Sequence, residues 1–285
     1  MADGFVLINK KINVTSRSVD NTIQRLFHNR KVGHLGTLDP FASGLLVIAI
    51  GKGCKVLPFI DDSFKTYRAV FVLGKKTDTG DLTGQVIEEK DVLKINESII
   101  KKVFDSFIGD SEQIPPMRSA LHHEGERLYD LARKGIEVER KARKIYIKSL
   151  DLLSFSKNCI EFAVNCSRGT YVRTLGEDIA NKLNTVGYLS SLERTSIGNI
   201  SLAEAVSIDE LKETDLINPV KLISLKQIIV SDEETIQSVK SGKRIRLNEK
   251  EEKILLVEKI NGELTPLAVY NLIEENLYSP VRGLF

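Results

Sequence analysis

KVGHLGTLDPFASGLL, residues 31–46, joins a glycine-rich loop to a short apolar strand, predicted at GLLVIAIG, residues 44–51. In this loop Asp39 stands directly before Pro40, and a residue before proline is biased out of the helical region. We therefore expect the Asp39 carboxylate on a stiff turn beside a buried strand. A carboxylate in that place can be a nucleophile or a base, although an isolated Asp-Pro pair more often only starts a turn.

Outside this stretch, the spacing of apolar residues predicts further strands and helices. Strands are predicted at FVLINK (5–10), TYRAVFVLG (66–74) and CIEFAVNC (159–166), and helices from Ser16, Asn96 and Thr170. Ser16 is expected to cap the first helix, with Leu26 among the residues of its buried face. Because these elements follow no regular βαβ rhythm, the sequence predicts an α+β fold.

Two regions differ in character from the apolar core. Residues 113–144 contain a Pro pair, a short helix ended by Gly135 and many basic side chains. Such a long excursion from a compact domain is usually functional or mobile. From about residue 230 short strands alternate with turns, and Asn261-Gly262 is typical of a hairpin. We expect a main domain at 1–225, which includes the excursion, and a small β domain at 230–285.

Composition is that of an ordinary globular protein, with 285 residues, 42% hydrophobic and 28% charged. The net charge is only +2, but residues 1–60 carry a net +5, residues 118–148 a net +4 and residues 177–225 a net −4. This distribution suits a protein that turns one face to a phosphate-bearing partner. Solvated helix faces without any partner would give the same counts.

Several functional classes lose support because their motifs are missing. The sequence has neither a GxxxxGK[ST] phosphate loop nor a complete dinucleotide fingerprint, and its four histidines lack metal-ligand spacing. Cys54, Cys159 and Cys166 form no CxxC pair and are expected as buried free thiols. Apolar runs fall far short of the roughly 18 residues that a membrane span needs. We therefore expect a cytoplasmic protein that uses no metal or small-molecule cofactor and no membrane.

A second cluster, CSRGTYVRTLGEDIA at 166–180, is predicted to begin a helix whose first turn contains Arg173. A cation there opposes the positive end of the helix dipole, so an acidic partner or a phosphate would explain it. A solvent-exposed arginine on a tolerant helix is an equally good interpretation. Tyr67, in FKTYRAV, would ordinarily be a half-buried strand aromatic.

In this order, GHLGTLDPFASGLL, KTYRA, TDTGD, IPPMRSALHHEGERLYDLARKGIEV and CSRGTYVRTLGEDI resemble the bacterial tRNA pseudouridine synthases of the TruB type, which modify uridine 55 in the T loop. The resemblance extends over residues 4–200, and GTLDP with RGTYVRTL is highly specific. It implies a mixed, mainly antiparallel sheet flanked by helices. The tail resembles, more weakly, the small C-terminal PUA domain of that family. Lys11 and Lys144 depart from the usual family residues, which concerns local loop shape only.

The resemblance implies an isomerase that converts uridine to pseudouridine with one carboxylate, that of Asp39. Tyr67 is implied to stack on the target base and Arg173 to pair with Asp39. Leu192 is implied to form an apolar wall of the pocket. His34 is implied to enter the T loop and help hold the flipped nucleotide out of its stack.

Further contacts with RNA are expected from Lys10, from Tyr171 and from Arg140, Lys141 and Arg143 of the excursion, which we interpret as a thumb that closes on the T stem-loop. The expected partner is tRNA, and the expected state is a monomer. Two alternatives stay open. One is a pseudouridine synthase of the same fold that acts on another RNA, and the other is an RNA-binding or tRNA-folding chaperone with secondary catalysis.

Overall fold

The computed structural model describes residues 3–119 and 121–285, and its main element is a nine-stranded sheet. The strands are β1 (Gly4–Lys10), β2 (Val32–Leu35), β3 (Ser43–Ile50), β4 (Phe64–Leu73), β7 (Gly109–Gln113), β10 (Arg143–Ser156), β11 (Cys159–Ser167), β12 (Gly187–Ile197) and β13 (Ile200–Ser201). Their spatial order is β1-β3-β12-β4-β11-β10-β7, with β2 beside β3 and β13 beside β12. Neighbours are antiparallel except β3 and β12, which confirms the predicted α+β fold with a mixed, mainly antiparallel sheet.

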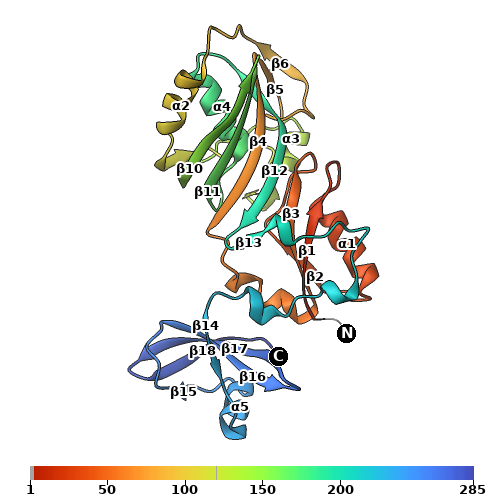
Figure 1. Cartoon of the computed structure of the whole chain (residues 1–285), viewed down its shortest axis with the longest axis vertical. Coiled ribbons are helices and arrows are strands. Elements are labelled where there is room, and N and C mark those ends of the chain that lie inside the picture. The colour runs from red at the N-terminus through yellow and green to blue at the C-terminus, as the bar shows by residue number, and fades with distance from the viewer. Residues whose placement is uncertain (1–2, 120) are drawn as a thin grey trace.

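Three long helices bury one face each against the two halves of this sheet. They are α1 (Ser16–Leu26), α2 (Glu97–Asp105) and α4 (Val172–Lys182). Helix α1 packs Val19 and Ile23 against the half that contains β1, β2 and β3. Helices α2 and α4 share a second core with strands β4, β10, β11 and β12. In Figure 1 this second half lies at one end of the molecule and α1 with its strands lies in the middle.

The start of α1 lies one residue earlier than predicted. Thr15 caps the helix, because its side chain accepts a hydrogen bond from the Ser18 amide at 3.0 Å. Ser16 is buried instead and exchanges two hydrogen bonds with the backbone of Leu38, at 2.9 and 3.1 Å. Leu26 was also predicted wrongly, since its side chain is 48% exposed at the end of the helix. Ser16, which was predicted to cap the helix, therefore connects α1 to the Asp39 loop.

The two halves of the large sheet meet where β3 and β12 pair in parallel. Only two residue pairs make this junction, Ser43 with Glu193 and Gly44 with Arg194. Gly44 has a φ of +99°, and a Cβ atom added there would lie 2.4 Å from the carbonyl oxygen of Arg194. A side chain at this position would therefore force the strands apart.

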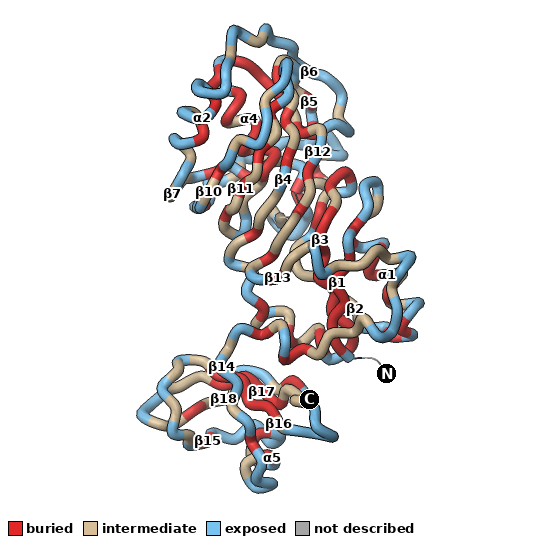
Figure 2. The backbone as a smooth tube through the Cα atoms, viewed as in Figure 1, coloured by how far each residue is buried: buried red, intermediate tan, exposed pale blue. Residues whose placement is uncertain are grey.

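A separate five-stranded sheet forms the far end of the molecule in Figure 1. It consists of β14 (Lys226–Ile229), β15 (Ile245–Arg246), β16 (Lys253–Ile260), β17 (Glu263–Glu274) and β18 (Leu277–Gly283), with helix α5 (Glu233–Lys240) packed beside it. The predicted hairpin is confirmed, because β16 and β17 pair around Asn261 and Gly262, which have φ values of +51° and +87°. Figure 2 shows buried strands inside this sheet and exposed connections around it.

The excursion at 113–144 contains little regular structure. Its elements are β8 (His122–His123), β9 (Glu126–Arg127) and α3 (Leu128–Arg133), and residue 120 lies outside the described residues. Gly135 has a φ of +73° just beyond α3, as its predicted role at the helix end requires. Outside the excursion, the remaining short elements are β5 (Lys75–Thr77), β6 (Val86–Glu89) and the 3-10 helices Gly51–Lys55, Leu57–Phe59, Leu202–Glu204, Glu213–Asp215 and Pro219–Leu222.

All three cysteines carry free thiols, as expected, but they differ in exposure. Cys166 is buried and Cys54 is partly buried, whereas Cys159 is exposed at the start of β11. The prediction that all three are buried is therefore wrong for Cys159. Among residues 3–119 and 121–285, no helix combines the length and the apolar character that a membrane crossing takes.

Candidate active site

A cavity of about 1000 Å³ opens between the Asp39 loop, the start of α1, the turn after β5 and the excursion. Polar and charged side chains dominate its wall. The residues that line it are Thr15, Ser16, Arg17, Asp20, His34, Thr37, Leu38, Asp39, Pro40, Phe41, Thr79, Asp81, Thr83, Arg118, Ser119, His122, Arg127, Tyr129, Arg133 and Arg173. The cavity brings together three predicted site residues, Asp39, Arg173 and His34.

An ion pair joins Asp39 to Arg173 in this cavity, with Nη2 of Arg173 3.0 Å from Oδ2 of Asp39. The arginine side chain is only 5% exposed, and the aspartate side chain is 38% exposed. Asp39 comes from the loop before β3 and Arg173 from the first turn of α4, so the pair bridges the two halves of the large sheet. The cavity therefore contains an accessible carboxylate held by a buried guanidinium.

Two opposing effects set the charge state of Asp39. Burial raises the pKa of its carboxyl, and the nearby Asp81 carboxylate raises it further. The guanidinium of Arg173 and the ammonium of Lys10 act in the opposite direction. The net effect is a raised pKa, because burial outweighs the attraction of the two cations. Loss of either cation would favour the protonated acid.

The buried guanidinium of Arg173 has two further partners. It donates hydrogen bonds to the carbonyl oxygens of Thr79, at 3.0 Å, and of Arg118, at 2.8 Å. These acceptors and the Asp39 carboxylate account for a cation at the positive end of a helix dipole. Because Arg118 belongs to the excursion, the same guanidinium links the Asp39 loop, the turn after β5 and the excursion.

Lys10 lies beneath the Asp39 loop and not on the surface. Its residue is 1% exposed, and its ammonium donates hydrogen bonds to the carbonyl oxygens of Val14 at 2.7 Å, Lys11 at 3.0 Å and Pro40 at 3.4 Å. Burial lowers the pKa of Lys10 to about 8, although Asp39 counteracts the shift. We therefore correct the expectation that Lys10 contacts RNA directly, because its charge is directed into the protein.

Arg194 holds the other side of the Asp39 loop. It is 1% exposed and donates hydrogen bonds to the carbonyl oxygens of Gly36 and Leu45, each at 2.9 Å. A further hydrogen bond joins it to the hydroxyl of Tyr67. Burial raises the pKa of Tyr67, and Arg194 opposes that rise. The phenol of Tyr67 is thus fixed next to the loop by a buried cation.

Neither Leu192 nor Tyr171 is among the residues that line the large cavity. Leu192 packs in the core shared by β4 and β12, where it pairs with Ala69, and it is not part of the cavity wall. Its role as an apolar wall of the pocket stays a prediction. Tyr171 precedes α4, and its backbone exchanges hydrogen bonds of 2.8 and 3.1 Å with the side chain of Gln113 at the start of the excursion.

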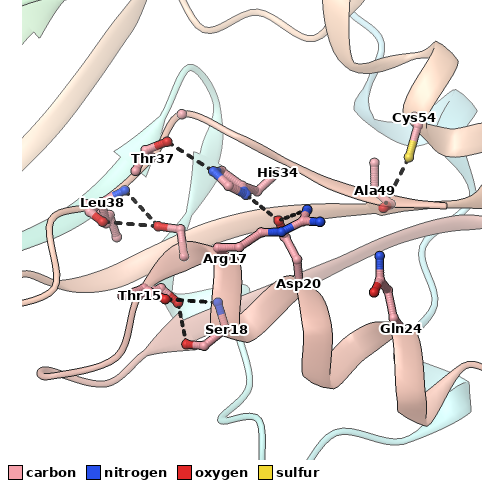
Figure 3. Close-up of polar contacts among 12 residues, drawn as sticks. Thr15, Arg17, Ser18, Asp20, Gln24, His34, Thr37, Leu38, Ala49 and Cys54 are labelled. Atoms are coloured by element: carbon pink, nitrogen blue, oxygen red, sulfur yellow. Dashed lines mark hydrogen bonds and ion pairs between the residues drawn. The ribbon is translucent and has the colours of Figure 1, made fainter. Parts of the chain in front are cut away.

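His34 is held between two side chains at the edge of the cavity (Figure 3). Its Nδ1 lies 2.9 Å from Oδ2 of Asp20, and its Nε2 lies 3.1 Å from the Thr37 hydroxyl. Arg17, on the turn of α1 before Asp20, brings its Nη1 to 3.5 Å from the same Oδ2. Asp20 and Thr37 thus hold the imidazole of His34 in place, and the ring forms part of the cavity wall.

The basic residues expected to contact RNA from the excursion, Arg140, Lys141 and Arg143, are not among those that line the large cavity. Arg140, Lys141 and Arg143 line a second, smaller cavity of about 230 Å³. Arg140 donates hydrogen bonds to the Pro115 carbonyl at 3.4 Å and to the Glu137 carboxylate at 3.2 Å. Lys141 and Arg143 are exposed. These charges form a group apart from the Asp39 and Arg173 pair.

Sequence reasoning assigned no role to Arg194, Asp20 or Asp81. Asp81 lies in TDTGD, a motif that the sequence did single out, and it lines the cavity while its Oδ1 accepts hydrogen bonds from Thr79 and Thr83. No local signal marks Arg194, because its acceptors are remote in sequence. A charged residue at a buried position of an amphipathic helix was the available signal for Asp20.

The sequence is similar to those of one family of enzymes. A sequence profile of the TruB family pseudouridylate synthases (N-terminal domain) matches residues 24–172. The tRNA pseudouridine synthase B of Syntrophomonas wolfei is 40% identical, over 98% of this chain and 97% of its own. That of Hydrogenovibrio crunogenus is 45% identical, over 74% of this chain and 69% of its own.

Among solved structures, the fold matches a chain from the crystal structure of a Cbf5-Nop10-Gar1 complex. The TM-score is 0.72 at 19% sequence identity, and the match covers 99% of this chain and 85% of that one. At this identity the likeness concerns the fold alone, and it extends through the five-stranded sheet.

Proposed function

Because the chain belongs to the TruB family of pseudouridylate synthases, we propose that it isomerises uridine to pseudouridine in tRNA, at position 55 of the T loop. The reaction breaks the N-glycosidic bond, turns the uracil within the site and joins its carbon 5 to the ribose. Atoms and electrons balance within the nucleotide itself. The chemistry therefore asks the protein for a charged group, a binding cavity and a means of holding the base.

One observation carries this proposal, the ion pair of Asp39 and Arg173 at 3.0 Å in the large cavity. The guanidinium engages Oδ2, so Oδ1 is the oxygen that the pair offers to the nucleotide. Arg173 also opposes the effect of burial on the pKa of the Asp39 carboxyl, so it favours the ionised form. We assign Asp39 as the catalytic carboxylate and Arg173 as the residue that positions and charges it.

The remaining site residues take roles around this pair. Tyr67 provides an aromatic face for the uracil, with its hydroxyl fixed by Arg194. His34 supports the extruded nucleotide from the edge of the cavity. Tyr171, at the first turn of α4 beside Gln113, contributes to RNA binding from the other side.

We divide the chain into a catalytic domain at 1–225 and an RNA-binding domain at 230–285. Within the first, residues 113–144 act as the thumb, with Arg140, Lys141 and Arg143 as contacts for phosphates. The surplus of basic residues in 1–60 and 118–148 supports this assignment, since both segments border the large cavity. The enzyme acts as a monomer in the cytoplasm, and light scattering of the free and tRNA-bound protein tests the first statement.

Tritium release from tRNA transcripts labelled at carbon 5 of uridine tests the function. The wild-type protein should release one tritium per tRNA, and Asp39→Asn should release none within the assay while it still binds the transcript. The matched control is Asp105→Asn, an exposed aspartate at the end of α2, which should react like wild type. Binding without release by the wild type would instead support the chaperone function.

A second measurement tests the position of the modified base. A transcript with cytidine at position 55 should bind and release no tritium. If release persists with that transcript, the enzyme acts at another uridine and the assignment to the T loop is wrong.

A further inference from the structure

Asp20 is a buried carboxylate on α1 that touches the cavity wall and has no part in the chemistry assigned above. Its side chain is 1% exposed, although the same face of the helix carries the apolar Val19 and Ile23. Oδ2 contacts Nδ1 of His34 and, more distantly, Arg17. Oδ1 is buried and lacks a hydrogen-bond partner among the described residues. Such an oxygen costs stability, so a purely structural purpose is a poor explanation.

The contact between Asp20 and His34 determines which ring nitrogen carries the proton. An ionised carboxylate only accepts hydrogen bonds, so Nδ1 of His34 must be the donor. In the neutral ring Nε2 then lacks a hydrogen and accepts a hydrogen bond from the Thr37 hydroxyl, 3.1 Å away. Figure 3 shows the imidazole lying between these two partners. The two contacts fix both the tautomer and the plane of the ring.

Asp20 itself cannot reach a ligand in this arrangement, because both of its oxygens are covered by protein. Asp20 can therefore act on RNA only through the side chains that its Oδ2 contacts, and His34 is the nearer of them, with a side chain that is 18% exposed and lines the cavity. Thr37 lies two residues before Asp39, so the imidazole is also linked to the loop that presents the catalytic carboxylate.

We infer that Asp20 is a positioning residue that orients His34 for the extruded nucleotide by holding its Nδ1–H tautomer. This inference rests on the proposed function, in which His34 supports that nucleotide. When RNA takes the place of the Thr37 hydroxyl, Nε2 is left to accept a hydrogen bond from the nucleotide. Asp20 keeps the ring in place during that exchange, as carboxylates do behind metal-bound histidines.

A structural role and a positioning role predict opposite effects on stability. If Asp20 served packing, Asp20→Leu would lower the melting temperature. If it serves His34, Asp20→Leu should leave the melting temperature unchanged or raise it, because a buried carboxylate with an unpaired oxygen is replaced by an apolar side chain. Activity should fall all the same. Asp20→Asn keeps an acceptor for Nδ1–H and should retain an intermediate activity.

The first experiment reads the tautomer of His34 directly. Nitrogen-15 spectra of the imidazole of His34 in the wild-type protein should show the Nδ1–H tautomer, and Asp20→Leu should abolish that preference. Assignment of the signals uses His34→Gln, in which they disappear. A wild-type ring protonated only at Nε2 would overturn the inference.

The second experiment is a double-mutant cycle on kcat/KM for the tRNA transcript. Asp20→Leu should lower kcat/KM about tenfold in the wild type, and less than about twofold when His34 is already Gln. Asp105→Asn serves as the control carboxylate on a helix and should change neither background. Equal losses in both backgrounds would overturn the inference, as would full activity of Asp20→Leu. A wild-type protein that releases no tritium would refute the proposed function instead.

Discussion

The Asp39 loop and the excursion at 113–144 face each other across one cavity, yet they are built in opposite ways. Buried side chains tie the loop to the core from three directions, through Ser16, Lys10 and Arg194. Among its described residues the excursion has one six-residue helix, two two-residue strands and surface ion pairs such as that of Lys134 with Glu126. A side chain in place of Gly125 or Gly135 would meet no atom within 4 Å.

The difference in structure suits the two regions to different tasks, the Asp39 loop to the reaction and the excursion to RNA binding. A reacting carboxylate has to be held in one geometry, and this requires buried partners that cannot relax into water. A surface that closes on a large polyanion gains more from mobile charges, which phosphates can order. We therefore expect substitutions in the loop to act on the rate of the bound complex, and substitutions in the excursion to act on binding.

The largest expected effect is on the rate of single turnover, when Arg173 is replaced. Arg173→Ala removes the cation that pairs with Asp39 and should slow single turnover by about 100-fold to 1000-fold, because the carboxylate then loses the partner that orients it. Arg173→Lys should recover only part of the rate, because an ammonium cannot reproduce the forked contacts of the guanidinium. The affinity for tRNA should stay near that of wild type. Arg168→Ala, an exposed arginine a few residues earlier, is the control.

Rapid-quench measurements at saturating enzyme give this rate, and filter binding gives the affinity. Wild-type turnover by Arg173→Ala would show that the ion pair has no catalytic role. If Arg173→Ala lost only affinity, Arg173 would act in binding, as the excursion is expected to do. The expected difference between the two regions would then be wrong.

An intermediate effect is expected in the excursion. Neutralising Arg140, Lys141 and Arg143 together should weaken tRNA binding roughly tenfold to a hundredfold. It should also reduce the slope of log affinity against log salt by roughly two to three, since each phosphate that the protein neutralises adds about 0.7–0.9 to that slope. The rate of the saturated complex should not change. Binding isotherms between low and moderate salt measure both the affinity and the slope.

A control with equal loss of charge is available in and before α2. Lys94, Lys101 and Lys102 are exposed residues in and before α2, and their replacement by Gln should leave the salt slope unaltered. Equal slopes for both triple variants would mean that the excursion makes no special contact with phosphates.

The smallest effect concerns Lys10. Its pKa of about 8 means that the ammonium loses its charge as the pH rises through that value, and Asp39 then loses one of the cations that attract it. Single turnover of wild type should fall roughly threefold from pH 7 to pH 9, and Lys10→Met should show no such step. Lys11→Met, at an exposed neighbour, should keep the step. Persistence of the step in Lys10→Met would assign it to another group.

Stability should show the opposite trend with pH. The pKa of Lys10 in the folded protein lies below its ordinary value of 10.5, so the unfolded chain binds more protons between about pH 8 and 10.5. The contribution of Lys10 to the free energy of unfolding therefore rises with pH in this window. Melting curves of wild type and Lys10→Met at several pH values separate this effect from the fall in rate.

Local patterns were sufficient for much of the fold. The apolar runs of β3 and β4 and the Asn261-Gly262 turn depend on neighbours in sequence, and the structure agrees with the predictions for them. The unusual place of Arg173 in a helix was also visible, because the dipole argument needs only one helix. Its pairing with Asp39 came from the family resemblance alone.

Local sequence patterns could not predict features that depend on contacts between distant segments of the chain. Lysine is almost never fully buried, so nothing in the sequence predicts Lys10 beneath Pro40. Thr15 and Ser16 are both good caps, and only the contact with Leu38 decides between them. Arg194 escaped notice because its acceptors, Gly36 and Leu45, lie in another half of the sheet.

The parallel junction of β3 with β12 also limits how early in protein synthesis the active site can form. Gly44 leaves the ribosome long before Arg194, and at about 5–20 residues per second the interval is roughly 8 to 30 seconds. Throughout that time the chain carries Asp39 without the strand that completes its support. The site therefore cannot be complete until β12 has been synthesised and lies between β3 and β4.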